Sequence, residues 1–147
     1  MICHVKGDIF DTDCNIICAP FSSSGVPEGT VSPALMHYKQ FRYEIESCSF
    51  SCNLIGRCFV VKRGIRPGIA VLITNDVHYE KRCSVLIHFL SKAVKEMLRI
   101  ADLHSFSVAI PYKMGCDDMQ DVDWNIFVKK FEEYMERYPQ IIVKLYN

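Results

Sequence analysis

The sequence lacks an excess of charge of either sign, because its 17 lysine and arginine residues equal its 17 aspartate and glutamate residues. A basic excess is typical of proteins that bind nucleic acid over a broad surface, so the balance argues against that class. The chain also lacks an apolar run of about 18 residues, which a membrane-spanning helix needs. It begins without the apolar run of a secretory signal peptide, so we expect a cytoplasmic, reducing location.

Paired C-x-x-C motifs are absent, although the chain contains eight cysteines. The closest pairs, Cys14 with Cys18 and Cys48 with Cys52, have three intervening residues, which is a weaker pattern for zinc. We therefore interpret most of the cysteines as free thiols. The sequence predicts neither a metal site nor a bound cofactor.

Half of the 147 residues are hydrophobic and 23% are charged, which is typical of one globular domain over residues 1–147. Strand-like and helix-like segments alternate, and this order predicts an α/β fold with a parallel or mixed sheet and helices on both faces. We expect strands at 15–19, 57–62, 69–74, 107–111 and 141–146. Helices are expected at 32–43, at 83–101, and after Asp123, which is a suitable N-cap.

Ligands of such sheets bind beyond the carboxyl ends of the strands. Three loops qualify: the first loop (residues 19–30), a middle loop (74–81) and the late loop (112–123). The first loop is rich in serine and glycine and leads into a helix, which favours an anion; an ordinary surface turn is the alternative. The late loop carries several aspartates, which suit acid–base chemistry or a divalent cation, or are simply solvated charges.

Two segments resemble a known family. Residues 5–10 (VKGDIF) resemble the opening of macro domains, which bind ADP-ribose. Residues 110–116 (IPYKMGC), followed by Asp123, Trp124 and Asn125, resemble the late motif of bacterial, phage and viral macro domains. That branch includes terminal ADP-ribose glycohydrolases and ADP-ribose-1″-phosphate phosphatases. The resemblance implies a three-layer α/β/α fold with a mixed sheet of about six strands.

The resemblance also implies the ligand-binding residues. Asp8 matches the acidic residue that recognises adenine, and Ile9 would lie beside the same ring. Residues of the first loop would wrap the distal ribose and the diphosphate, and residues of the late loop would cover the other side of the diphosphate. The first-loop residues are Ser22, Ser24, Gly25, Val26 and Gly29, and the late-loop residues are Met114, Gly115 and Cys116.

The sequence departs from the family pattern in two places. The glycines that usually follow Gly-Cys are replaced by residues 117–122 (DDMQDV), whose three carboxylates would repel a diphosphate. The lysine that glycohydrolase relatives carry after the central strand is also absent, since Asn75 and Asp76 stand there. A lysyl adduct is therefore not expected, and Asp118 or Asp121 is the candidate to orient or deprotonate a water molecule.

The resemblance implies a protein that binds ADP-ribose, ADP-ribosylated protein or another ADP-ribose derivative. Hydrolysis would remove ADP-ribose from modified proteins or phosphate from ADP-ribose-1″-phosphate. The alternative is a degenerate macro domain that acts as a protein- or RNA-interaction module, and Lys62, Arg63 and Arg66 form the basic strip that motivates the RNA version. If the source is viral, the location is the host cytoplasm. The oligomeric state is left open.

Overall fold

The computed structural model describes residues 1–75 and 87–147, which contain six strands in one mixed sheet. The sheet order is β1-β6-β5-β2-β4-β3. All neighbouring strands are parallel except β3, which runs antiparallel to β4. The strands are β1 (Ile2–Val5), β2 (Ile16–Ser22), β3 (Cys58–Val61), β4 (Gly68–Asn75), β5 (Val108–Pro111) and β6 (Val143–Tyr146).

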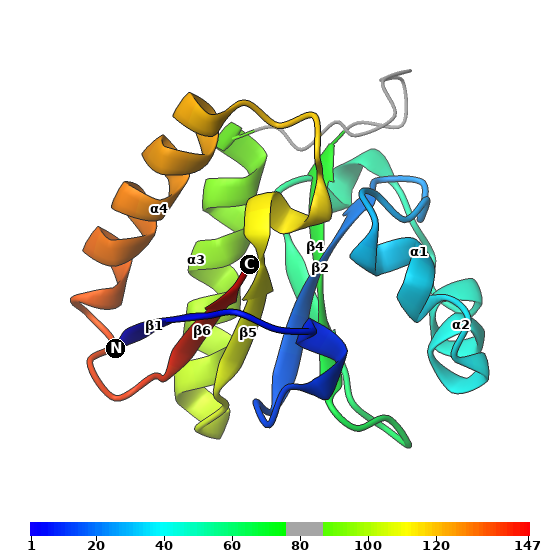
Figure 1. Ribbon diagram of the computed structural model, residues 1–147. Helices are drawn as coiled ribbons and strands as arrows, with labels where there is room; N and C mark the ends of the chain where they lie inside the picture. Colours follow the sequence, from blue (N-terminus) through cyan, green and yellow to red (C-terminus); the bar gives the residue numbers. More distant parts are fainter. Residues whose placement is uncertain (76–86) are drawn as a thin grey trace.

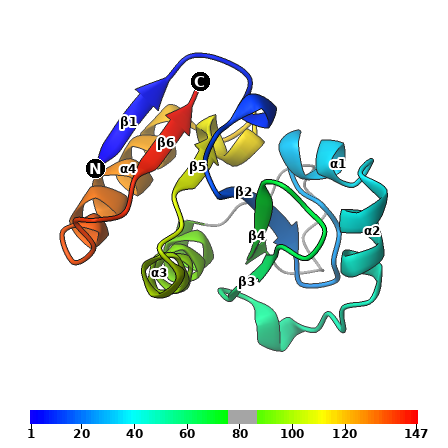
Figure 2. The ribbon, with the colours of Figure 1, turned by 90° about the horizontal axis from the view of Figure 1, so that it is seen from below.

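Helices cover both faces of this sheet, which confirms the expected three-layer arrangement (Figures 1 and 2). One face carries α3 and α4, and the other carries α1 and α2. The α-helices are α1 (Val31–Leu35), α2 (Lys39–Glu46), α3 (Ile87–His104) and α4 (Asp121–Met135). Short 3-10 turns are η1 (Ile9–Asp11), η2 (Cys52–Leu54) and η3 (Tyr112–Gly115).

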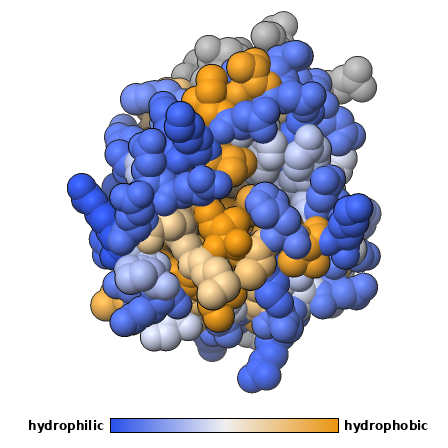
Figure 3. Space-filling view, turned by 60° about the vertical axis from the view of Figure 1, so that its left-hand side comes forward, coloured by the Kyte–Doolittle hydropathy of each residue, from blue (hydrophilic) through white to orange (hydrophobic). Residues whose placement is uncertain are grey.

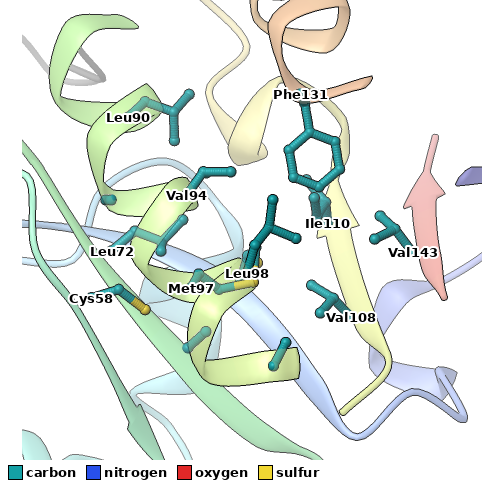
Figure 4. Packing of buried hydrophobic residues seen from close by; sticks show 14 of the residues in the cluster. Cys58, Leu72, Leu90, Val94, Met97, Leu98, Val108, Ile110, Phe131 and Val143 are labelled. Atoms are coloured by element: carbon teal, nitrogen blue, oxygen red, sulfur yellow. The ribbon is translucent and has the colours of Figure 1, made fainter. Parts of the chain in front are cut away.

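The core lies on the two faces of β2, β4 and β5, whose residues are all buried. On one face, Leu90, Val94 and Leu98 of α3 recur at helical spacing and point toward the sheet (Figure 4). They meet Leu72 of β4 and Val108 of β5 in one cluster. Burying each side chain of this size contributes about 1.5–3 kcal/mol to folding. This packing therefore holds α3 firmly against β4 and β5.

Two helix predictions need correction. The predicted helix 32–43 is two helices, because α1 ends at Leu35 and α2 begins at Lys39. Ser32, the first residue of the predicted helix, does not cap it. Its hydroxyl is buried and donates a hydrogen bond to the Pro20 carbonyl of β2 at 2.8 Å.

The N-cap of α4 is also different from the prediction. Gln120 occupies the cap position, and Asp123 lies in the first turn of the helix. Helix α3 continues to His104, beyond the predicted end at residue 101, while residues 83–86 of the predicted span lie outside the described residues.

Most of the described cysteines are free thiols, as expected: Cys3, Cys14, Cys18, Cys48, Cys52 and Cys58. Burial raises the pKa of Cys18 and Cys58, which keeps both thiols protonated and unreactive. Cys116 takes part in a disulfide bond, so the free-thiol interpretation is wrong for this residue.

The side of the molecule with α4 and β1 carries a band of apolar surface between polar side chains (Figure 3). Val122 and Ile126 of α4 are exposed apolar residues, as are Met1 and Ile142, which immediately precede β1 and β6. Within the described residues, no helix has the length and apolar character to cross a membrane.

Candidate ligand-binding site

The carboxyl ends of β5, β2 and β4 lie next to one another, because these strands are adjacent and parallel. They end at Pro111, Ser22 and Asn75. The first loop and the late loop follow β2 and β5 and therefore meet at the same edge of the sheet (Figure 1). The predicted middle loop, 74–81, lies outside the described residues after Asn75.

The first loop and the late loop are in direct contact through two glycines. The Thr30 amide donates to the Gly115 carbonyl at 2.9 Å, and the Thr30 hydroxyl donates to the same oxygen at 3.1 Å. A Cβ at Gly29 would lie 2.7 Å from that oxygen, and a Cβ at Gly115 would lie 3.2 Å from the Val31 nitrogen. Both glycines have φ near +75°, at +73° and +76°. The close approach and the backbone conformation both require glycine.

Ser22 organises the tip of the first loop. Its hydroxyl oxygen accepts hydrogen bonds from the Val26 amide at 3.1 Å and the Ser24 amide at 3.3 Å, and it shares a further bond with the Ser24 hydroxyl at 2.9 Å. Gly25 turns the chain with φ +84°, packed against the Phe50 ring. Ser22 is buried and shapes the loop, whereas Ser24 and Val26 are exposed and available to a ligand.

The start of the late loop is strained. Lys113, Met114 and Gly115 all have positive φ values of 51°, 56° and 76°. Such a conformation costs roughly 1–2 kcal/mol for each residue that is not glycine, so neighbouring contacts must hold it in place. The Met114 side chain is fully buried in the core, and the Lys113 ammonium lies 2.6 Å from Asp121 Oδ1.

The predicted late-loop ligand residues are buried, since Met114 is 0% and Cys116 1% exposed, and Gly115 is also buried. The side chains of Met114 and Cys116 face the interior of the protein. Contact between this part of the late loop and a ligand would therefore use backbone groups.

The carboxylates of the late loop are in different environments. Asp117 and Asp118 are exposed. Asp121 begins α4, and its hydrogen bond and ion pair with Lys113 hold the pKa of its carboxyl below the ordinary value. A carboxylate with a lowered pKa is a weaker base, so Asp121 is poorly suited to activating water. Among residues 1–75 and 87–147, no three acidic, histidine or cysteine side chains are grouped closely enough to hold a metal ion.

Asp8 and Ile9 follow the carboxyl end of β1, beside the end of β6. The Asp8 Oδ1 atom accepts a hydrogen bond from the Phe10 amide at 2.9 Å and so caps η1. Asp8 is exposed, whereas Ile9 is buried beneath it. Asp8 is therefore an exposed carboxylate that follows the carboxyl end of β1.

A buried polar pair beneath the first loop was missed by sequence reasoning. Glu28 is 6% exposed and Asn75 is 0% exposed. The side-chain amide of Asn75 donates a hydrogen bond to Glu28 Oε1 at 3.0 Å. The Ser23 amide also donates to the Asn75 carbonyl, at 3.1 Å, so the pair ties the first loop to β4. Nothing in the segment VPEG indicated burial, because a glutamate between turn residues is usually solvated.

No protein-family model matches this sequence, and no curated protein sequence matches it. Solved structures do match. The macrodomain of Thermus aquaticus DarG has a TM-score of 0.79 and 18% identity, over 100% of this chain and 98% of its own. The macrodomain of Mycobacterium tuberculosis DarG has a TM-score of 0.77 and 18% identity, over 99% and 97%. DarTG of Thermosipho africanus, solved in complex with ADP-ribose, has a TM-score of 0.70 and 13% identity, over 98% of this chain and 41% of its own.

Proposed function

This chain has the macrodomain fold, and from this premise we propose that it binds ADP-ribose or a derivative of it. The observation that carries the proposal is the contact between the first loop and the late loop through Gly29 and Gly115. It brings two glycine-containing backbone segments together at the carboxyl ends of parallel strands, where α/β sheets bind ligands. Residues 1–147 would act as one macrodomain, since all six described strands belong to one sheet.

In this proposal the ligand lies along the edge of the sheet. Adenine lies against Asp8 and the backbone of Ile9, and the distal ribose lies at the exposed tip of the first loop, Ser24 to Val26. The diphosphate lies between the two loops, where backbone N–H groups are the donors that suit phosphate. The solved complex of the Thermosipho africanus DarTG with ADP-ribose supports this choice of ligand.

Lys113 reduces the negative charge that the diphosphate meets. The sequence alone predicts three repelling carboxylates, but one of them, Asp121, is paired with the Lys113 ammonium at 2.6 Å. Asp117 and Asp118 are left as exposed charges, and water screens such charges effectively. We therefore expect binding whose affinity changes with salt concentration.

Calorimetric titration with ADP-ribose at two salt concentrations tests the proposal. We expect saturable binding by the parent chain and a loss of at least about tenfold in affinity for Gly115→Ala, because its added Cβ crowds Thr30 and Val31. Gly64→Ala is the matched control: its φ is +71°, but its added Cβ meets nothing closer than 3.4 Å. Absence of heat with the parent chain, at any attainable ligand concentration, would reject the proposal.

We further propose that any hydrolysis depends on Asp118, which would orient or deprotonate the attacking water. Asp118 is exposed in the late loop, whereas Asp121 is engaged by Lys113. The substrates to assay are ADP-ribosylated protein and ADP-ribose-1″-phosphate. Product release should fall in Asp118→Ala and persist in Asp117→Ala. Equal activity of both variants would remove Asp118 from this role.

The alternative is an interaction module that keeps the fold without binding ADP-ribose. The exposed carboxylates of Asp117 and Asp118 at the proposed diphosphate site favour it. It predicts that ADP-ribose produces no thermal shift in the parent chain, and that Asp117→Asn with Asp118→Asn does not create one. A shift in either protein would exclude this alternative.

A further inference from the structure

A cavity of about 250 Å³ lies at the amino-terminal end of the central strands, and Phe10, which follows the proposed adenine residues Asp8 and Ile9, lines one side of it. We call it the basal cavity. Its inner surface includes Ile17 of β2 and Ile69 of β4, which are register partners near the starts of their strands. In Figure 1 this is the lower end of the sheet, where the turn between β3 and β4 lies. No residue assigned to ADP-ribose lines it.

Aromatic and aliphatic side chains line the basal cavity together with the polar residues Lys39, Gln40 and Arg66. Phe10 comes from η1 and Phe41 from α2, and Ile65 comes from the turn that precedes β4. Phe41 is fully buried and packs edge-on against Phe21, with 6.0 Å between the ring centroids. Phe41 therefore supports the cavity from within the core, and the half-buried Phe10 and Ile65 are the apolar side chains that would meet a flat apolar group.

Two cations border this apolar space. Lys39 and Arg66 both line it, and no aspartate or glutamate does. Within the described parts of the chain, neither cation forms an ion pair. Two carboxylates, Asp11 and Asp13, line the adjoining hollow that shares Arg66, but Asp13 is bound to Lys144 at 2.6 Å. Glu44 lies one hydrogen bond away, since its Oε1 accepts from the lining residue Gln40 at 3.1 Å. The charged side chains that line the cavity itself are therefore both cations.

We infer that the basal cavity binds a small molecule in which an aromatic ring carries an anionic group. The ring would occupy the space between the apolar walls, and the anion would meet Arg66 and Lys39 at the mouth. Its volume lies below the usual range of roughly 300–1,000 Å³ for ligand pockets, which limits the ligand to about one ring with its charged substituent. Arginine suits such an anion because its guanidinium donates two parallel hydrogen bonds to carboxylate or phosphate. This inference does not depend on the proposed function.

Three probes separate the contributions of ring and charge: phenyl phosphate, phenol and inorganic phosphate. Each is titrated into the full chain while the backbone amide resonances are followed by NMR. Phenyl phosphate should bind at least about tenfold more tightly than phenol or inorganic phosphate. It alone of the three probes has both a ring to contact the apolar side chains and a phosphate to contact the cations. The shifts should centre on residues around Phe41 and Ile65. Equal affinity for phenol, or shifts centred on the first and late loops, would overturn the inference.

Two arginines of the same turn provide a matched pair of variants. Arg66 lines the basal cavity and Arg63 does not, although both are exposed. Arg66→Gln should weaken phenyl phosphate binding about tenfold and leave phenol binding unchanged, whereas Arg63→Gln should change neither. Equal losses in the two variants would show a diffuse surface charge effect and overturn the inference.

Two further experiments complete the test: competition with ADP-ribose, and a variant whose larger side chain fills the basal cavity. Saturating ADP-ribose should not displace phenyl phosphate, since the two sites share no residue; displacement would overturn the inference. Ile65→Trp should fill the cavity and abolish phenyl phosphate binding, and its thermal unfolding shows whether it folds. If it folds and still binds, the ligand lies elsewhere; if it does not fold, the Arg66 and Arg63 variants decide the outcome.

Discussion

The two ends of the central strands are built by different means. At the carboxyl ends, glycines let two loops touch through their backbones, and the exposed side chains include aspartates. At the amino-terminal ends, packed side chains enclose the basal cavity, and its charged residues are cations. One end depends on backbone conformation and the other on side-chain volume. Substitutions should therefore damage the two ends in different ways.

The largest expected effect is a loss of stability at the amino-terminal ends of the central strands. Phe41→Ala should lower the free energy of unfolding by about 3–5 kcal/mol, because a fully buried ring is lost and a cavity remains. Chemical denaturation measures this loss, with Tyr43→Ala as the control, an exposed ring on the same helix. Where Phe41→Ala is still folded, its affinity for ADP-ribose should be unchanged. A loss of affinity there would mean that the two ends are coupled.

The buried pair at the carboxyl end should give the next largest effect. Asn75→Ala leaves the Glu28 carboxylate without its amide donor and should destabilise the protein by about 1.5–3 kcal/mol. The exposed Asn53→Ala is the control. Denaturant unfolding measures both variants. Equal stabilities would mean that the hydrogen bond between Asn75 and Glu28 contributes nothing to stability.

A pair of glycine variants isolates the effect of loop contact. Gly29→Ala and Gly64→Ala impose the same backbone strain, about 1 kcal/mol, because their φ values are +73° and +71°. Only Gly29→Ala also drives a Cβ to 2.7 Å from the Gly115 carbonyl. We expect the Gly29 variant to be less stable by about a further 1 kcal/mol and to lose ADP-ribose affinity. Equal stabilities in thermal and denaturant unfolding would show that the late loop shifts to accommodate the added Cβ at little energetic cost.

The smallest effect concerns the ion pair of Lys113 with Asp121. Asp121 has a lowered pKa in the folded protein, so its contribution to stability is present above the unfolded-state value near 3.9. That contribution is lost as the pH falls through the lower folded-state value. Asp121→Asn should therefore flatten the acid side of the Tm profile slightly and leave Tm differences between pH 6 and 8 constant. An unchanged acid profile would mean that the exposed pair contributes nothing, as many surface pairs do.

Most strands and the long helix were predictable because their patterns are local. The buried run 69–74 is the middle of β4, and the helical spacing of Leu90, Val94 and Leu98 identified α3. The break between α1 and α2 was not predictable, because residues 36–38 (MHY) contain no glycine or proline to mark it. The resemblance to macro domains is confirmed at the level of the fold, while the assigned ligand residues remain predictions.

The sequence by itself determined the class of fold, the loops that follow β2 and β5, and the glycines within them. These follow from hydrophobic periodicity and from residue types that act within a few positions of the chain. Only the tertiary structure decided that Gly29 meets Gly115, that Glu28 is buried against Asn75, and that Lys39 and Arg66 border one cavity. Each of these joins residues more than 20 positions apart, and their proximity depends on strand order and helix packing, which no local pattern contains.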